Sequence, residues 1–192
     1  MKDRDFFEVC CRLLQESSRG KEIYVFDFDD TLVRTSSKIH LTTVDNRGKK
    51  NYVSLTPAEY ASYTKKPNDV FDYSDFERVI DPKLITPTYA LFRRVIQDFG
   101  HENVFILTAR GAAEPIRKYL ESLGVRGIRI FAVGSSDPRE KARQISEEII
   151  SRGIKIVNFY DDAAKNIEAV RELRDKFPLV KIRTIRLRSP NR

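Results

Sequence analysis

The chain has 192 residues, of which 41% are hydrophobic, and it carries a formal net charge of +7. This length allows one sizeable hydrophobic core and is short for two full domains, so we expect one domain over residues 1–192 that contains an insertion. The two adjacent cysteines, Cys10 and Cys11, exclude an ordinary disulfide framework and a zinc site.

Membrane insertion is not expected, because no apolar run approaches the ~20 residues of a membrane span. The first five residues also lack the apolar stretch of a signal peptide. We therefore expect a cytoplasmic protein without a membrane partner. Its positive charge favours acidic partners such as phosphate esters or nucleic acid.

The first third of the chain predicts a helix, a buried strand and a hairpin. Helical spacing of apolar residues covers 3–18, Gly20 supplies a stop, and the apolar run that follows predicts a strand over about 22–27. Residues 38–44 and 51–55 flank a turn-rich segment, which is typical of a hairpin. Thr56 and Glu59 form a capping pattern for a short helix through about Tyr63. Residues 65–81 have no regular pattern.

From residue 86 onward, helical and strand patterns alternate. Such alternation predicts an α/β fold: a doubly wound parallel sheet with helices on both faces and a small insertion after the first strand, at about 33–85. Helices are predicted over 88–99, 113–123, 138–152 (capped by Asp137 and ended by Gly153) and 164–176, and strands over 104–107, 128–133, 154–160 and 180–187.

Polar side chains follow three of the predicted strands. They are Asp27 and Asp29 after the first strand, Thr108 and Arg110 after the second, and Asp161 and Asp162 after the fourth. Because parallel strands open their carboxyl ends into one crevice, these groups should lie close together. Four carboxylates in one place need a cation, and an all-oxygen set suits Mg²⁺.

These residues carry a resemblance to a known family. The run Asp27-Phe28-Asp29-Asp30-Thr31 resembles the first signature of the haloacid dehalogenase (HAD) superfamily, Asp-x-Asp-x-Thr. Ile106-Leu107-Thr108 is similar to the second signature, Lys141 lies where the third has its lysine, and Tyr160-Asp161-Asp162 is similar to the fourth. The match spans about residues 22–166 and implies a HAD-like, Rossmannoid fold. Asp30 stands where many members have glycine.

The resemblance implies a Mg²⁺-dependent phosphatase. Asp27 would be the nucleophile and form an aspartyl-phosphate, and Asp29 would protonate the leaving alcohol and then activate water. The metal would be held by Asp27, the main-chain carbonyl of Asp29 and Asp162, with Asp161 as a ligand or a supporting partner. Thr108 and Lys141 would bind phosphoryl oxygens.

Several assignments have alternatives at this stage. Asp30 or Thr31 can cap a turn, Thr108 can satisfy a strand-end amide, and Asp161 or Asp162 can cap the next helix. Arg110 can clamp the substrate phosphate or pair with an acid. Lys141 is preferred over Lys155, which begins a strand and should face away from the site. Asn166 is a weaker candidate for positioning the metal ligands.

The substrate is less defined than the reaction. The insertion carries cations and tyrosines that would suit a nucleotide or a nucleic-acid end; they are Lys38, Arg47, Lys49, Lys50, Tyr52, Tyr60 and Tyr63. The same residues can instead be a solvated hairpin edge with packed rings. The run Leu107–Arg110 is faintly similar to the phosphatase half of phage polynucleotide kinases. A small-metabolite phosphatase and a non-catalytic nucleic-acid-binding module are the alternatives.

Overall fold

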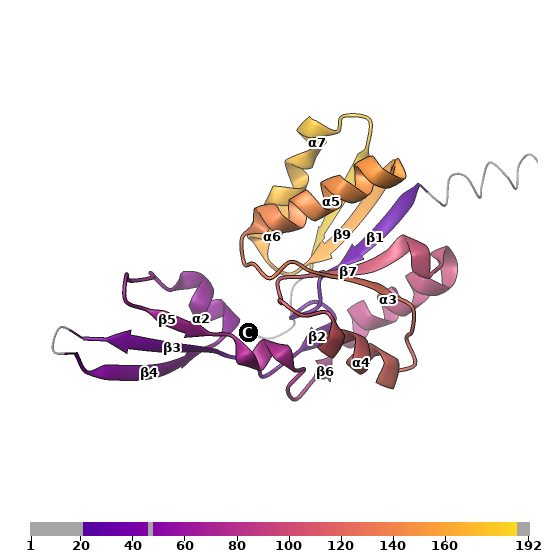
Figure 1. Cartoon of the computed structure of the whole chain (residues 1–192). Helices are drawn as coiled ribbons and strands as arrows, with labels where there is room; N and C mark the ends of the chain where they lie inside the picture. Colours follow the sequence, from indigo (N-terminus) through magenta and orange to yellow (C-terminus); the bar gives the residue numbers. More distant parts are fainter. Residues whose placement is uncertain (1–20, 46–47, 188–192) are drawn as a thin grey trace, which may run out of the picture.

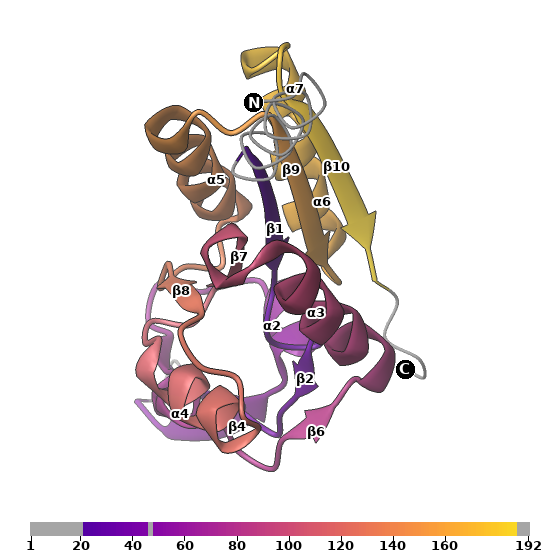
Figure 2. The same cartoon turned by 90° about the vertical axis from the view of Figure 1, so that its right-hand side faces the viewer.

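The fold is built on a five-stranded parallel sheet. The computed structural model describes residues 21–45 and 48–187, so the predicted helix at 3–18 and the cysteine pair lie outside the described residues. The strand order is β10-β9-β1-β7-β8, and β10, β9 and β1 lie side by side in Figure 2. The strands are β1 (Glu22–Phe26), β7 (Val104–Thr108), β8 (Arg129–Ala132), β9 (Ile156–Asp161) and β10 (Lys181–Arg186).

Helices cover both faces of this sheet, as predicted (Figure 1). One apolar cluster joins α5 (Pro138–Arg152), α6 (Ala164–Arg171) and α7 (Leu173–Lys176) to one face. The other cluster joins α3 (Thr86–Phe99) and α4 (Glu114–Ser122) to the opposite face. Alternate residues of β1 enter the two clusters, Val25 the first and Phe26 the second, because side chains alternate along a strand.

Burial of large apolar side chains stabilises both layers. Phe26 and Phe92 are fully buried, and their ring centroids lie 5.3 Å apart in an edge-to-face arrangement. Each such side chain contributes roughly 1.5–3 kcal/mol on transfer from water. β1 lies between β7 and β9, and the two apolar clusters bury its two faces, so its carboxyl end opens into the centre of the sheet edge.

The insertion after β1 forms a separate small sheet. Strands β2 (Val33–Arg34) and β6 (Lys83–Leu84) pair at its base, and we call residues 35–82, between them, the cap. Its hairpin, β3 (Ile39–Val44) and β4 (Lys50–Leu55), and its helix α2 (Pro57–Ser62), with the capping box of Thr56 and Glu59, confirm the prediction. Figure 1 shows the cap sheet extending away from the main sheet.

Four details differ from the predictions. Residues 65–81 contain a third cap strand, β5 (Val70–Asp72), which pairs with β3, and a short 3₁₀ helix, η1 (Ser74–Glu77). A three-residue strand is too short to show alternation. The predicted helix over 164–176 is divided into α6 and α7, β9 begins at Ile156 rather than 154, and a 3₁₀ turn, η2 (His101–Asn103), precedes β7. None of the helices in the described part of the chain is long and apolar enough to span a membrane.

Candidate active site

A buried lysine joins two aspartates at the carboxyl edge of the sheet. Lys141 Nζ donates to Asp27 Oδ1 at 2.6 Å and to Asp161 Oδ2 at 2.8 Å. Asp27 follows β1, Asp161 ends β9, and Lys141 lies in the first turn of α5, which begins after the N-cap Asp137. All three residues are at least nine-tenths buried. The sequence placed these residues at one edge, and the structure brings them into direct contact.

Burial shapes the electrostatics of this group. Burial alone would lower the pKa of Lys141, but Asp27 and Asp161 outweigh it, so the pKa of the ammonium lies above its ordinary value. Burial raises the pKa of the Asp27 carboxyl, Lys141 opposes this, Asp161 reinforces it, and the net shift is well upward. One ammonium therefore does not fully compensate the acids around it.

A third carboxylate completes an all-oxygen cluster. Oxygens of Asp27, Asp161 and Asp162 lie within 4.8 Å of one another. Burial raises the pKa of Asp162 to about 6, and repulsion from Asp161 and Asp30 adds to the shift. A hard divalent cation would relieve the destabilisation of both Asp27 and Asp162, and carboxylate oxygens are the ligands that Mg²⁺ prefers. The residues present therefore fit a magnesium ion.

The two adjacent aspartates of this cluster have different surroundings. Asp161 is fully buried, and it accepts hydrogen bonds from Lys141, from the Ala163 amide at 2.8 Å and from the Asn166 side chain at 3.0 and 3.1 Å. Asp162 is half-buried and lines the open pocket. Asp162 is thus the better placed ligand, and Asp161 orients Lys141. The N-cap residue of α6 is Ala163 and the helix has no side-chain cap hydrogen bond, so neither Asp161 nor Asp162 is its N-cap residue.

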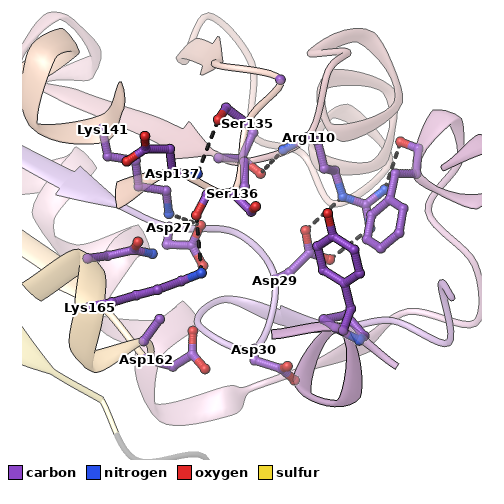
Figure 3. A pocket seen from close by; sticks show the side chains of 18 of the residues that line it. Asp27, Asp29, Asp30, Arg110, Ser135, Ser136, Asp137, Lys141, Asp162 and Lys165 are labelled. Atoms are coloured by element: carbon purple, nitrogen blue, oxygen red, sulfur yellow. Dashed lines mark hydrogen bonds and ion pairs between the residues drawn. The ribbon is translucent and has the colours of Figure 1, made fainter. Parts of the chain in front are cut away.

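The carboxylate of Asp29 is held by Arg110 and by the hydroxyl of Thr35. Arg110 Nε and Nη2 donate to the two Asp29 carboxylate oxygens, each at 2.7 Å. Thr35 Oγ1 donates to Asp29 Oδ1 at 3.1 Å. The dashed lines in Figure 3 show the bidentate pair. The side chain of Asp29 is therefore fixed in one orientation at the pocket.

The position of Arg110 corrects the prediction of a phosphate clamp. Its Nη1 donates to the carbonyls of Phe76 at 3.0 Å and Arg78 at 2.6 Å, and Nη2 also donates to Thr35 Oγ1 at 3.2 Å. These contacts and the two to Asp29 engage all five N–H donors of a guanidinium. The side chain is 1% exposed. The described arrangement leaves no donor for a substrate phosphate and instead ties Asp29 to both ends of the cap.

Thr108 lies at the end of β7 and lines the same pocket. Its hydroxyl oxygen accepts the Arg110 amide at 3.2 Å, which is the strand-end role considered above. This leaves the hydroxyl proton to donate elsewhere. Lys155, the alternative lysine, is exposed and absent from the pocket lining, whereas Lys141 lines it.

The turn after β1 explains the residue at position 30. Asp30 has φ of 55°, the left-handed region that favours glycine and that aspartate tolerates better than most residues. Its amide donates to the Val33 carbonyl at 2.8 Å and closes the turn. Thr31 Oγ1 is the one buried side-chain polar atom without a hydrogen bond in the described part of the chain, so Thr31 does not cap this turn.

These groups line a pocket of about 740 Å³. Asp27, Asp29, Asp162 and Lys141 line its inner wall, and the dashed line in Figure 3 joins Lys165 to Ser136 at the pocket. The cap contributes Ile39, Pro57, Tyr60, Lys65, Tyr73 and Phe76. Arg47 lies outside the described residues, and of the other cap residues singled out from the sequence only Tyr60 lines the pocket. The described hairpin lysines do not, because β3 and β4 extend away from the sheet.

Three pocket cations were missed by sequence reasoning: Lys65, Lys165 and Arg186. Lys65 lies in a segment without a regular pattern, so nothing in the sequence placed it near the acids. Lys165 had a usable signal, because it follows Asp162 by three residues and falls in the first turn of a predicted helix, where the helix dipole disfavours a cation.

Comparison of the chain with protein-family models, with curated proteins and with solved structures found no match. The α/β fold with its parallel sheet is compatible with a Rossmann-like architecture. The site at the carboxyl edge of that sheet is an acidic cluster in which one buried lysine bridges two of the aspartates.

Proposed function

We propose that the protein is a Mg²⁺-dependent phosphomonoesterase of the HAD type that works through an aspartyl-phosphate on Asp27. One observation carries the proposal: Lys141 bridges the buried Asp27 and Asp161 at 2.6 and 2.8 Å, with Asp162 in the same cluster. Burying two acids and a lysine beside a third, half-buried acid is costly, and such groups are typical of sites that serve chemistry. A module that only binds nucleic acid has no need of this group.

The first chemical step follows from the positions of Asp27 and Asp29. An Asp27 carboxylate oxygen forms a bond to phosphorus while the bond from phosphorus to the leaving oxygen breaks, and Asp29 gives its proton to that oxygen. Lys141 fixes the attacking carboxylate and balances part of the negative charge of the phosphoryl group. The Thr108 hydroxyl donates to a phosphoryl oxygen.

The second step releases the phosphate. Asp29 takes a proton from a water molecule whose oxygen bonds to phosphorus, and the bond from phosphorus to Asp27 breaks. Arg110 and Thr35 hold Asp29 so that it faces the same point in both steps. A magnesium ion held by Asp27, the Asp29 carbonyl and Asp162 would shield the anionic phosphate from the anionic nucleophile.

Phosphate release from an aryl phosphate in the presence of Mg²⁺ tests the proposal. The wild-type protein should release phosphate, and Asp27→Asn should reduce release to the buffer background. Asp175→Asn is the matched control, because Asp175 is an exposed aspartate on α7 that does not line the pocket. Equal background rates for wild type and Asp27→Asn would refute the enzymatic function.

The substrate is proposed to be a nucleotide or a terminal phosphate of a nucleic acid. Support comes from the aromatic residues Tyr60, Tyr73 and Phe76 on the cap side of the pocket and from its cations. Nucleotides, phosphorylated oligonucleotides and sugar phosphates compared at one salt concentration would separate this class from small-metabolite phosphates. Higher kcat/KM for sugar phosphates would contradict it.

A further inference from the structure

The outer part of the pocket contains positive charge that the phosphoryl-transfer chemistry does not use. Lys165 and Arg186 come from the core and Lys65 comes from the cap. All three are exposed, whereas Lys141 is buried against the nucleophile. At about 740 Å³, the pocket is within the ~300–1,000 Å³ range of small-molecule sites and is larger than one phosphate requires.

Lys165 is the cation best placed for a ligand. Its Nζ donates to the Ser136 carbonyl at 3.1 Å, and a neutral carbonyl does not balance the charge of an ammonium that has three donors. The nearby acid on this wall, Asp137, interacts with Lys165 but more strongly with Arg139, whose Nε lies 3.0 Å from both carboxylate oxygens. Lys165 also lies in the first turn of α6, where the helix dipole disfavours a cation.

The cap wall presents aromatic rings with another cation. Lys65 Nζ lies 4.9 Å from the centroid of the Tyr60 ring and 5.4 Å from that of Phe71. The hydroxyls of Tyr60 and Tyr73 are 2.7 Å apart, which fixes the two rings relative to each other. Tyr60, Tyr73 and Phe76 all line the pocket. This wall offers flat apolar surface for a ring in the leaving group.

We propose that Lys165 binds a second phosphate group of the substrate, carried by the leaving nucleoside whose ring lies against the aromatic cap wall. The inference rests on the proposed phosphatase function and narrows its substrate. A nucleoside bisphosphate and an oligonucleotide with a terminal phosphate both supply this chemistry, the first as a second monoester and the second as the neighbouring diester. Lys165 acts on that second group and not on the phosphate that Asp27 attacks.

Steady-state kinetics with matched substrates test this role. Phosphate release is measured for an aryl phosphate, a nucleoside 3′,5′-bisphosphate and a dinucleotide with a terminal phosphate. The proteins are wild type, Lys165→Gln, Lys165→Arg and Lys155→Gln. Lys155 is an exposed lysine outside the pocket and serves as the control.

Lys165→Gln should lower kcat/KM for at least one two-phosphate substrate by about 10-fold more than for the aryl phosphate, the range of a lost charge-assisted hydrogen bond. The loss should appear mainly in KM. Lys165→Arg should retain most of the preference, and Lys155→Gln should behave as wild type. If kcat/KM falls for both two-phosphate substrates, Lys165 binds either a monoester or a diester as the second group. If kcat/KM falls for only one of them, that substrate shows which of the two groups Lys165 binds.

Equal losses for the aryl phosphate and both two-phosphate substrates would overturn the proposal, since Lys165 would then serve the scissile phosphate or the fold. No loss with any substrate would overturn it as well. Both results require a wild-type protein that hydrolyses the aryl phosphate, so the proposed function would survive them. A wild-type protein that releases no phosphate would overturn both proposals.

Discussion

The cations of the core site are buried, whereas the cap lysine that lines the pocket is exposed. In the core, Lys141 and Arg110 are buried and pair with Asp27, Asp161 and Asp29 at 2.6–2.8 Å. In the cap, Lys65 is exposed and lies over aromatic rings. Buried pairs are rigid and costly to break, whereas exposed cations contribute little to folding. In the proposed function, the core performs the chemistry and the cap selects the substrate.

Arg110 is the place where the two regions meet. It holds the Asp29 carboxylate with two donors and the cap carbonyls of Phe76 and Arg78 with two more. The orientation of Asp29 therefore depends on the position of the cap base. The following predictions test changes in the core and in the cap, and the first has the largest expected effect.

Removing the buried lysine should cost far more stability than removing a cap lysine. Lys141→Gln leaves Asp27 and Asp161 buried without a counter-charge, which should lower the free energy of unfolding by about 3–5 kcal/mol. Lys65→Gln removes only an exposed cation near two rings, worth under ~1 kcal/mol. Urea unfolding of both variants measures the difference. Similar losses would contradict the contrast between core and cap.

We predict a structural role for Asp161 and a metal-binding role for Asp162. Asp161→Asn breaks the contact with Lys141 and should destabilise the protein by about 3 kcal/mol. Asp162→Asn should raise the Mg²⁺ concentration needed for half-maximal activity by at least ~10-fold. Metal titration of activity and urea unfolding in chelator give the two readouts. A larger metal effect for Asp161→Asn would reverse the assignment.

The charge of Asp162 should be unfavourable to folding when no metal is bound. Its folded-state pKa of about 6 exceeds the ordinary 3.8, so the folded protein loses stability as the pH rises from about 4 to above 6. In chelator at pH 7, Asp162→Asn should therefore increase the free energy of unfolding, by about 1 kcal/mol after allowance for partial solvent exposure. A decrease would contradict this sign.

A second core network should show the opposite pH dependence. Burial alone would raise the pKa of Glu148, but Arg129 and Arg152 outweigh it and the pKa lies below its ordinary value of 4.5. The stabilisation is therefore present above about pH 4.5 and is lost as the pH falls through the lower folded-state pKa. Glu148→Gln should cost about 2 kcal/mol at pH 7.

The measurement for Glu148 is urea unfolding of wild type and variant at pH 7, 4 and 3. The gap between the two proteins should shrink as the pH falls, because the wild-type carboxylate becomes protonated. Glu121→Gln, an exposed position on α4, is the control. A gap that stays constant across the series would show that the pairing with Arg129 and Arg152 contributes no pH-dependent stability.

A small effect that is confined to the cap is expected in the cap helix. Thr56 Oγ1 accepts the Glu59 amide at 3.2 Å and completes the capping box of α2. Thr56→Ala should cost about 1 kcal/mol, confined to the cap. Amide hydrogen exchange should speed up in α2 and leave β1 unchanged. Faster exchange in β1 would show that cap and core unfold together.

The sequence predicted the core better than the cap for a physical reason. β1 is a continuous apolar run that is typical of a buried strand, and Asp137 and Gly153 mark the ends of α5 with local chemistry. β5 has three residues and exists because it pairs with β3, a contact that no local pattern encodes. Arg110 shows the same limit. Its place after a strand predicted that it lies at the crevice, but the acceptors of its guanidinium come from distant parts of the chain and are set by tertiary packing.

Capture of the covalent intermediate tests the central claim most directly. An aryl phosphate with a good leaving group needs no proton for the first step, so Asp29→Asn should form the aspartyl-phosphate and then hydrolyse it about 10²- to 10⁴-fold more slowly. With Mg²⁺, this variant should release about one equivalent of the aryl alcohol rapidly and carry one phosphate on Asp27. Release without phosphate on the protein, or phosphate on another residue, would contradict the account.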